Sequence, residues 1–247
     1  KIASAQLNPT VGDLEGNIAL AKEAFERAKA DGADILVLPE QLIIGYPAED
    51  LVLKPAAVED CRLLAEDFAK LTKDGPAVVF NLPWADGAHL YNAALFMRGG
   101  EITDARYKHH LPNYGVFDEA RIFTRGPLPD PIEFKGVMIG LPICEDLWQE
   151  GVASHLRARG AELMISPNGS PWRRTALSER TEALGDKVHT SGLPLIYVNQ
   201  VGGQDELVFD GSSFSMSAAG AIVQSLKSFV PDYDVSVWEK EGGKWVC

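Results

Sequence analysis

The chain has 247 residues, of which 46% are hydrophobic and 23% are charged, and its formal net charge is −12. Nucleic-acid surfaces need clustered lysine and arginine, so this acidic balance argues against binding of nucleic acid. No apolar run approaches the length that crosses a bilayer, and we expect no signal peptide and no membrane partner. The three widely spaced cysteines include no Cys-x-x-Cys pair, which favours a reducing, cytoplasmic setting without a structural zinc site.

Strands and helices are predicted to alternate in the first third of the chain. The helix expected at 14–30 places Ile18, Ala21 and Phe25 on one face, and Gly32 ends it. The run at 35–40 is apolar up to Pro39, as is typical of a buried strand. The elements predicted here are a strand at 1–7, a helix at 14–30, a strand at 35–40, a helix at 58–71 and a strand at 77–82.

The middle of the chain has a different pattern. Two alternating segments, 91–97 and 102–108, flank the turn RGGE and predict a β-hairpin. So many strands with few helices favour two packed sheets with helices on their outer faces, an α/β fold in a four-layer αββα sandwich. No composition break marks a linker, so we expect one domain over residues 1–247. The remaining predicted elements are a strand at 137–143, a helix at 152–159, a strand at 163–166, a helix at 178–191, a strand at 195–200 and hairpins at 207–217 and 221–226.

Three ionisable residues, Glu40, Lys108 and Cys144, stand at the ends of predicted strands. Side chains at strand ends sit on a rigid scaffold and face loops, where functional sites are usually built. Each residue also has a simpler interpretation, since a strand-end Glu or Lys is commonly a solvated charge and a lone cysteine is commonly part of the core. A helical pattern follows Cys144, and its N–H groups would favour the nucleophilic thiolate.

Together these residue types form a set that hydrolyses carbon–nitrogen bonds. A thiolate attacks the carbon of an amide or nitrile. A lysine ammonium stabilises the resulting oxyanion and lowers the thiol pKa, while a carboxyl group protonates the leaving nitrogen and then activates water. The set therefore predicts hydrolysis through a thioester-type intermediate. No Gly-x-Ser-x-Gly elbow is present, which counts against a serine hydrolase.

The order Leu38-Pro39-Glu40, Lys108 and Cys144-Glu145-Asp146 resembles the Glu-Lys-Cys triad of the carbon–nitrogen hydrolase (nitrilase) superfamily. Three longer strings are similar to the glutaminase domains of glutamine-dependent NAD⁺ synthetases, and the resemblance covers essentially the whole chain. These strings are GYPAEDL at 45–51, KHHLPNYGVFDE at 108–119 and NQVGGQDELVFDG at 199–211.

The resemblance implies a role for each matching residue. Glu40 would be the proton acceptor and donor, Lys108 would stabilise the oxyanion with the backbone N–H of Glu145, and Cys144 would be the nucleophile. Glu119 matches an acidic residue that supports the lysine. The substrate-binding candidates are Tyr114, Trp148 and Ser170, together with Glu145, which would meet the α-amino group.

One position departs from the family pattern. Relatives commonly carry a lysine six residues after the position of Ser170, where it helps to bind the substrate carboxylate, and this chain has Ala176 there. A guanidinium suits a carboxylate bidentately, so Arg173, Arg174 or Arg180 would take its place. The sequence does not choose among the three arginines.

By resemblance, then, we expect a nitrilase-type sandwich that hydrolyses the side-chain amide of L-glutamine through a cysteine thioester. No metal or organic cofactor is needed for this half-reaction. In the family, the ammonia passes to a C-terminal synthetase domain that uses ATP, with Mg²⁺, to amidate deamido-NAD⁺, and no such domain is present within these 247 residues. The chain begins with Lys1 and not with methionine, so we expect that a few N-terminal residues have been removed.

A homo-oligomer is also expected, because such sandwiches commonly pair. Two other functions stay open at this point. One is a stand-alone amidase of the same superfamily that acts on another small amide. The other is a non-catalytic scaffold domain for a synthetase or an oligomer.

Overall fold

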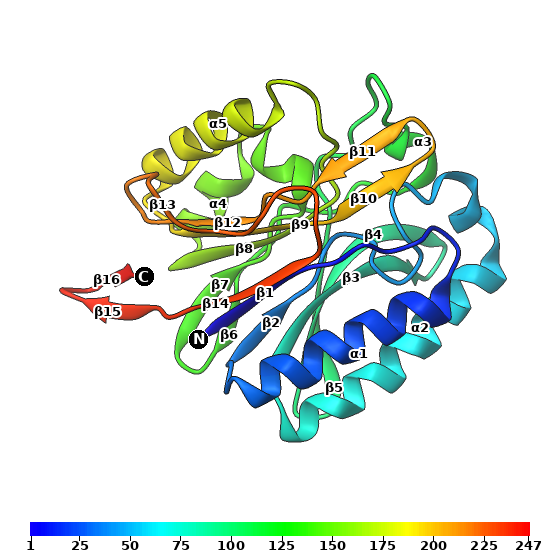
Figure 1. Ribbon diagram of the computed structural model, residues 1–247, viewed down its shortest axis with the longest axis horizontal. Helices are drawn as coiled ribbons and strands as arrows, with labels where there is room; N and C mark the ends of the chain where they lie inside the picture. The colour runs from blue at the N-terminus through cyan, green and yellow to red at the C-terminus, as the bar shows by residue number, and fades with distance from the viewer.

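The computed structural model describes all 247 residues and shows two six-stranded sheets packed face to face, with helices on both outer faces (Figure 1). The first sheet has the order β14 (Asp232–Ser236), β1 (Ile2–Gln6), β2 (Ile35–Val37), β3 (Ala77–Asp86), β4 (His89–Arg98), β5 (Glu101–Tyr107). The second has the order β13 (Ile222–Ser225), β12 (Phe214–Met216), β9 (Leu195–Asn199), β8 (Leu163–Asn168), β7 (Val137–Gly140), β6 (Ile132–Phe134).

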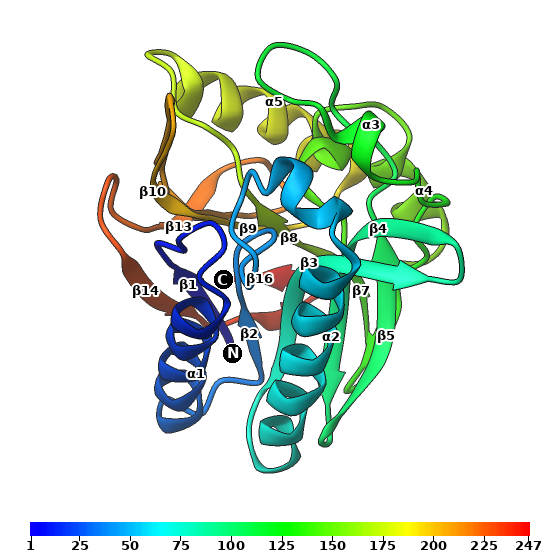
Figure 2. The ribbon, with the colours of Figure 1, turned by 90° about the vertical axis from the view of Figure 1, so that its right-hand side faces the viewer.

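The longer helices form the two outer layers. Figure 2 shows α1 and α2 side by side against the first sheet, with α5 on the opposite side of the molecule. Two small hairpins, β10–β11 and β15–β16, lie outside the main sheets. The bounds are α1 (Leu14–Ala30), α2 (Pro55–Ala69), α3 (Glu119–Ile122), α4 (Val152–Ala158), α5 (Ala176–Ser191), β10 (Val201–Gln204), β11 (Leu207–Asp210), β15 (Glu239–Glu241) and β16 (Lys244–Val246).

Strand alternation creates the layers. Along β3, Val78 and Phe80 point toward α1 and α2, whereas Ala77 and Val79 point toward the second sheet. The buried apolar residues accordingly form three clusters, one between α1, α2 and the first sheet, one between the sheets, and one beneath α4 and α5. Phe68 joins the outermost layer to the first sheet, with its ring centroid 5.0 Å from that of Phe80. The predicted four-layer αββα sandwich is confirmed.

Some predicted elements need correction. The segment 207–217 is not one hairpin, because Leu207–Asp210 pairs with Val201–Gln204 and Phe214–Met216 pairs with β9 and β13. The ladder of β2 also ends at Val37, and the next residues leave it as an extended segment that ends in a turn. That early exit carries Glu40 away from its own sheet, and its N–H donates to the carbonyl of Asn168 at 3.3 Å.

The topology brings the ends of several strands together. β2 runs parallel to β3. β4 is antiparallel to both β3 and β5, so β5 also runs in the direction of β3. β7, β8 and β9 are mutually parallel. The carboxyl ends of parallel strands share one edge of a sheet. Glu40 follows β2, Lys108 follows β5 and Cys144 follows β7, so the three predicted residues arise from this edge of both sheets.

Candidate active site

Lys108 lies in a buried ion cluster with two glutamates. Its Nζ donates to Oε1 of Glu40 at 2.7 Å and to Oε1 of Glu119 at 2.8 Å. The side chains of Lys108 and Glu40 have no exposed surface, and that of Glu119 is 6% exposed. Burial opposes the charged ammonium, but Glu119 and then Glu40 outweigh it and raise the pKa of Lys108 well above its usual value. Lys108 is therefore a fixed positive charge.

Both oxygens of Glu40 are held by donors from different layers. Its Oε1 accepts from Nδ2 of Asn92 at 2.8 Å as well as from Lys108. Its Oε2 accepts from the backbone N–H of Gly169 at 2.9 Å. Asn92 belongs to the first sheet and Gly169 follows β8 of the second, so the carboxylate is oriented from both sides.

Glu119 opens the short helix α3 and faces inward. The hydroxyl of Tyr46 donates to its Oε1 at 2.9 Å, while its buried Oε2 has no hydrogen-bond partner. Burial raises the pKa of Glu119, and Lys108 only partly offsets this. The two carboxyls thus share one buried ammonium, whose positive charge opposes the effect of burial on Glu119.

Cys144 begins a one-turn 3₁₀ helix, Cys144–Leu147, and has a positive φ of 43°. The left-handed region is costly for a residue with a side chain and persists only where neighbours enforce it. Burial and then Glu40 raise the pKa of the Cys144 thiol well above its usual value, whereas Lys108 lowers it. The expectation that helix N–H groups favour a resting thiolate is therefore wrong, because four residues make only one turn and burial dominates.

A cavity of about 320 Å³ opens onto Cys144. Cys144 is the only member of the triad that lines it, since Glu40 and Lys108 lie fully buried behind. Five of the six predicted substrate-binding residues also line it: Tyr114, Glu145, Trp148, Ser170 and Arg173. Hydrophobic neighbours complete the wall, among them Val116, Phe117, Pro171, Trp172, Ala176 and Leu207. Such a mostly apolar cavity with a few polar groups is typical of a small-molecule site.

The charged residues of the cavity stand on different elements. Glu145 follows Cys144, and its carboxylate accepts from the hydroxyl of Tyr114 at 2.9 Å and from Nε2 of Gln149 at 2.7 Å. Arg173 is the cavity's only basic residue, and its guanidinium pairs with Glu179. Arg174 does not line the cavity, and neither does Arg180.

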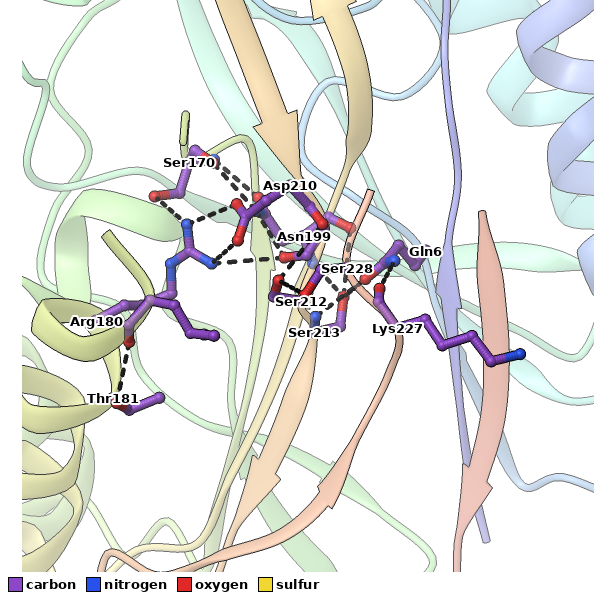
Figure 3. A network of polar contacts seen from close by, with 12 residues as sticks. Gln6, Ser170, Arg180, Thr181, Asn199, Asp210, Ser212, Ser213, Lys227 and Ser228 are labelled. Atoms are coloured by element: carbon purple, nitrogen blue, oxygen red, sulfur yellow. Dashed lines mark hydrogen bonds and ion pairs between the residues drawn. The ribbon is translucent and has the colours of Figure 1, made fainter. Parts of the chain in front are cut away.

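Arg180 instead belongs to a buried polar network with Ser170, Asn199 and Asp210 (Figure 3). It has no exposed surface, and its Nη2 lies 3.1 Å from Oδ1 of Asp210 and 3.5 Å from Oγ of Ser170. Asn199 holds the same serine, accepting from its N–H at 2.8 Å and donating to its carbonyl at 3.1 Å. The network therefore fixes the position of Ser170, and Arg180 is separated from the cavity by the groups it binds.

Sequence reasoning missed three residues that hold the two glutamates of the ion cluster: Asn92 and Gly169 at Glu40, and Tyr46 at Glu119. Asn92 left a usable signal, because a polar residue within an otherwise apolar strand is normally buried with a partner. The sequence around Gly169 gave no such signal. A Cβ there would lie 2.7 Å from Cδ1 of Tyr46, so glycine lets Tyr46 pack beneath the backbone.

No group of three or more His, Cys, Asp or Glu side chains is placed to hold a metal ion. None of the helices combines the length and apolar character needed to cross a membrane.

The fold and the buried Glu-Lys-Cys set define a carbon–nitrogen hydrolase of the nitrilase type. The sequence profile of the carbon-nitrogen hydrolase family matches residues 1–232, and the chain belongs to this family. It is 44% identical to the glutamine-dependent NAD(+) synthetase of Rhodobacter capsulatus, over 93% of this chain and 42% of that protein. The corresponding enzyme of Thermotoga maritima is 38% identical over 93% of this chain and 40% of its own length. The chain thus spans less than half the length of these relatives.

Solved structures agree with this placement. A glutamine-dependent NAD⁺ synthetase from Acinetobacter baumannii superposes with a TM-score of 0.90 and 35% identity, covering 94% of this chain and 44% of that one. A variant of an amidase from Nesterenkonia sp. AN1, in which acrylamide has added to the active-site cysteine, superposes with a TM-score of 0.83 and 26% identity. That match covers 95% of this chain and 92% of the amidase.

Proposed function

We propose that the chain hydrolyses the side-chain amide of L-glutamine to glutamate and ammonia. The observation that carries this proposal is the arrangement around Lys108, whose ammonium is held between Glu40 and Glu119 directly behind the cavity-facing Cys144. A nucleophile, an oxyanion-stabilising cation and a proton carrier are thus assembled on rigid strand ends. Similarity to glutamine-dependent relatives supports glutamine as the amide.

The first half-reaction forms a thioester. Cys144 passes its proton to Glu40 as the sulfur attacks the carboxamide carbon, so the reactive thiolate forms only during the attack. Negative charge develops on the amide oxygen, where the Lys108 ammonium and the backbone N–H of Glu145 stabilise it. Glu40 then returns the proton to the nitrogen, the carbon–nitrogen bond breaks, and ammonia leaves. A γ-glutamyl thioester remains on Cys144.

The second half-reaction restores the enzyme. Glu40 accepts a proton from water, whose oxygen attacks the thioester carbon, and Lys108 again stabilises the oxyanion. The carbon–sulfur bond breaks, the thiolate recovers the proton, and glutamate leaves. Each half uses the same three side chains, and neither step requires a metal or an organic cofactor.

Charges in the cavity suit the zwitterionic end of an amino acid. In this proposal Glu145 meets the α-ammonium, and Arg173 meets the α-carboxylate. The support is that both line the cavity and that Arg173 is its only basic side chain. An arginine–carboxylate pair is charge-assisted and can be bidentate. Arg173 therefore takes the carboxylate-binding role left open by Ala176, and it does so by exchanging Glu179 for the substrate. Tyr114, Trp148 and Ser170 supply the remaining contacts.

We propose further that the ammonia is used to amidate deamido-NAD⁺, as part of a glutamine-dependent NAD⁺ synthetase. ATP and Mg²⁺ would act in a separate synthetase domain, and the protein would assemble as a homo-oligomer. The support is the name of the relatives, glutamine-dependent NAD(+) synthetase, and the share of their length that this chain leaves unmatched.

A stand-alone amidase is the second candidate, favoured by the match to 92% of the Nesterenkonia amidase. Ammonia release from L-glutamine and from acetamide and propionamide, measured at equal concentrations, separates the two. Higher kcat/KM for glutamine supports the glutaminase, and higher kcat/KM for the aliphatic amides overturns it. Cys144→Ala must abolish release, and a variant that keeps it would show that Cys144 is not the nucleophile. A wild-type chain that releases no ammonia from any of these amides would leave only the scaffold function.

A further inference from the structure

Asp146 joins the residues that follow Lys108 to the residue that precedes Cys144, although it does not line the cavity at Cys144 and makes no hydrogen bond to a triad side chain. Its Oδ1 accepts from the backbone N–H groups of His109 at 3.0 Å and His110 at 2.8 Å. Its Oδ2 accepts from the backbone N–H of Ile143 at 3.0 Å. His109 and His110 directly follow Lys108, and Ile143 directly precedes Cys144.

The two segments joined in this way belong to different sheets. Lys108 follows β5, the edge strand of the first sheet, whereas Cys144 follows β7 of the second. The distance from the ammonium to the sulfur thus depends on how the two sheets meet at this end of the sandwich. Asp146 spans that junction with a side chain that is buried and 1% exposed.

Asp146 also encloses the strained nucleophile. Its own N–H donates to the carbonyl of Ile143 at 3.0 Å, while its carboxylate accepts from the N–H of the same residue. These reciprocal bonds close a turn that contains only Cys144 and Glu145. They provide the local constraint that keeps Cys144 at a φ of 43°.

We propose that Asp146 is a positioning residue, which holds the Cys144 nucleophile in its left-handed conformation and in register with the Lys108 ammonium across the two sheets. The inference rests on the proposed hydrolysis at Cys144. The ionised carboxylate, which predominates above its pKa of about 7, suits this place because all three neighbours are donors, whereas an asparagine of the same size presents one acceptor oxygen and turns a donor toward the other side. Displacing two reacting groups by a fraction of an ångström slows a reaction without weakening ground-state binding.

The test is Asp146→Asn in ammonia release from L-glutamine, with Phe25→Leu as the control. Phe25 is buried between α1 and the first sheet, so its substitution lowers stability without reaching the site. We expect kcat to fall about 10- to 100-fold in Asp146→Asn with KM within about threefold of wild type, while Phe25→Leu keeps the wild-type kcat. An unchanged kcat in Asp146→Asn, or a loss equal to that of Phe25→Leu, would overturn the proposal.

Two further measurements keep the test decisive. If Asp146→Asn does not fold, Asp146→Glu replaces it, because the carboxylate stays but moves by one methylene, and a wild-type kcat would again overturn the role. If the wild-type chain releases no ammonia, the proposed function fails by itself. The rate at which iodoacetamide alkylates Cys144 at one pH then measures its positioning. We expect this rate to be about tenfold lower in Asp146→Asn than in the wild type. Equal rates in the two proteins would overturn the proposal.

Discussion

The ammonium of Lys108 lies 2.8 Å from Oε1 of Glu119, and the pair is shielded from solvent beneath the cavity that contains Cys144. Glu119 contributes most to raising the pKa of Lys108, ahead of Glu40, which also has to carry protons in the reaction. A second carboxyl therefore leaves Glu40 free to change its charge while the lysine stays protonated. Glu119 keeps Lys108 protonated and Glu40 carries protons, which explains why one cation needs two acidic neighbours.

Glu119→Gln should accordingly lower kcat for amide hydrolysis by about 10- to 1000-fold, a range typical of losing one electrostatic contributor. The amide still accepts from Tyr46, so the chain should fold, with a loss of up to about 3 kcal/mol from the broken buried pair. Steady-state kinetics and denaturant unfolding measure both quantities. Asp118→Asn is the neighbouring control, since its carboxylate is half-exposed and should matter by less than about 0.5 kcal/mol. Equal kcat values for the two variants would contradict this role for Glu119.

Arg173→Gln should raise KM for L-glutamine by about 10- to 100-fold, because a charge-assisted hydrogen bond contributes roughly 1.5–3 kcal/mol. Hydrolysis of an uncharged amide such as propionamide should not change, since it has no carboxylate to bind. Arg174→Gln is the matched control and should resemble wild type with both substrates. A rise in KM with Arg174→Gln and none with Arg173→Gln would show that Arg174, and not Arg173, binds the substrate carboxylate.

Alkylation of Cys144 by iodoacetamide should accelerate with pH up to and beyond pH 9, because burial and Glu40 raise its thiol pKa. Glu40→Gln removes that negative charge, so the pH midpoint of alkylation should move down although hydrolysis is lost. Peptide mapping at several pH values follows both. Cys61 is an internal reference, since burial raises its pKa to about 12 and its labelling should stay slow in both proteins. A midpoint that moves up in Glu40→Gln would show that electrostatics does not set the thiol pKa.

Stability should depend on pH through Asp146. Burial raises its pKa from 3.8 to about 7 in the folded chain, so the folded state binds this proton more tightly than the unfolded chain. The stabilisation by this proton is thus fully present below about pH 4 and is lost as the pH rises through about 7. The free energy of unfolding should fall over this range by up to roughly 4 kcal/mol.

Denaturant unfolding of the wild type and Asp146→Asn at pH 4.5 and pH 7.5 measures this effect. The difference between the two proteins should shift in favour of the variant at the higher pH. A difference that is the same at both values would mean that Asp146 is ionised throughout.

Much of the scaffold was predictable because hydrophobic periodicity reports directly on burial. The helix at 14–30 was predicted with the bounds that α1 has, and the core strand predicted at 77–82 lies within β3, which the structure places between two apolar layers. The segment 207–217 was mispredicted because its apolar residues belong to two strands that pair with different partners. Pairing partners are set by contacts that are distant in sequence, and periodicity carries no information about them.

In the site, too, some features were predictable from the local sequence and others depend on contacts that form only in the folded chain. Strand ends indicated Glu40, Lys108 and Cys144, and resemblance added Glu119, which lies at 2.8 Å from the lysine. The charge state of Cys144 was mispredicted, since burial and the approach of Glu40 arise only in the folded chain. Three candidate arginines were indistinguishable in sequence, whereas the structure buries Arg180 against Asp210 and leaves Arg173 at the cavity.

Covalent trapping shows whether Cys144 is the residue that attacks the side-chain amide of glutamine. The chain is treated with 6-diazo-5-oxo-L-norleucine, an electrophilic glutamine analogue, and its modified peptides are identified by mass spectrometry. We expect one adduct, on Cys144, that L-glutamine suppresses and D-glutamine does not. Adducts on Cys61 or Cys247, or labelling of Cys144 that L-glutamine leaves unchanged, would contradict it.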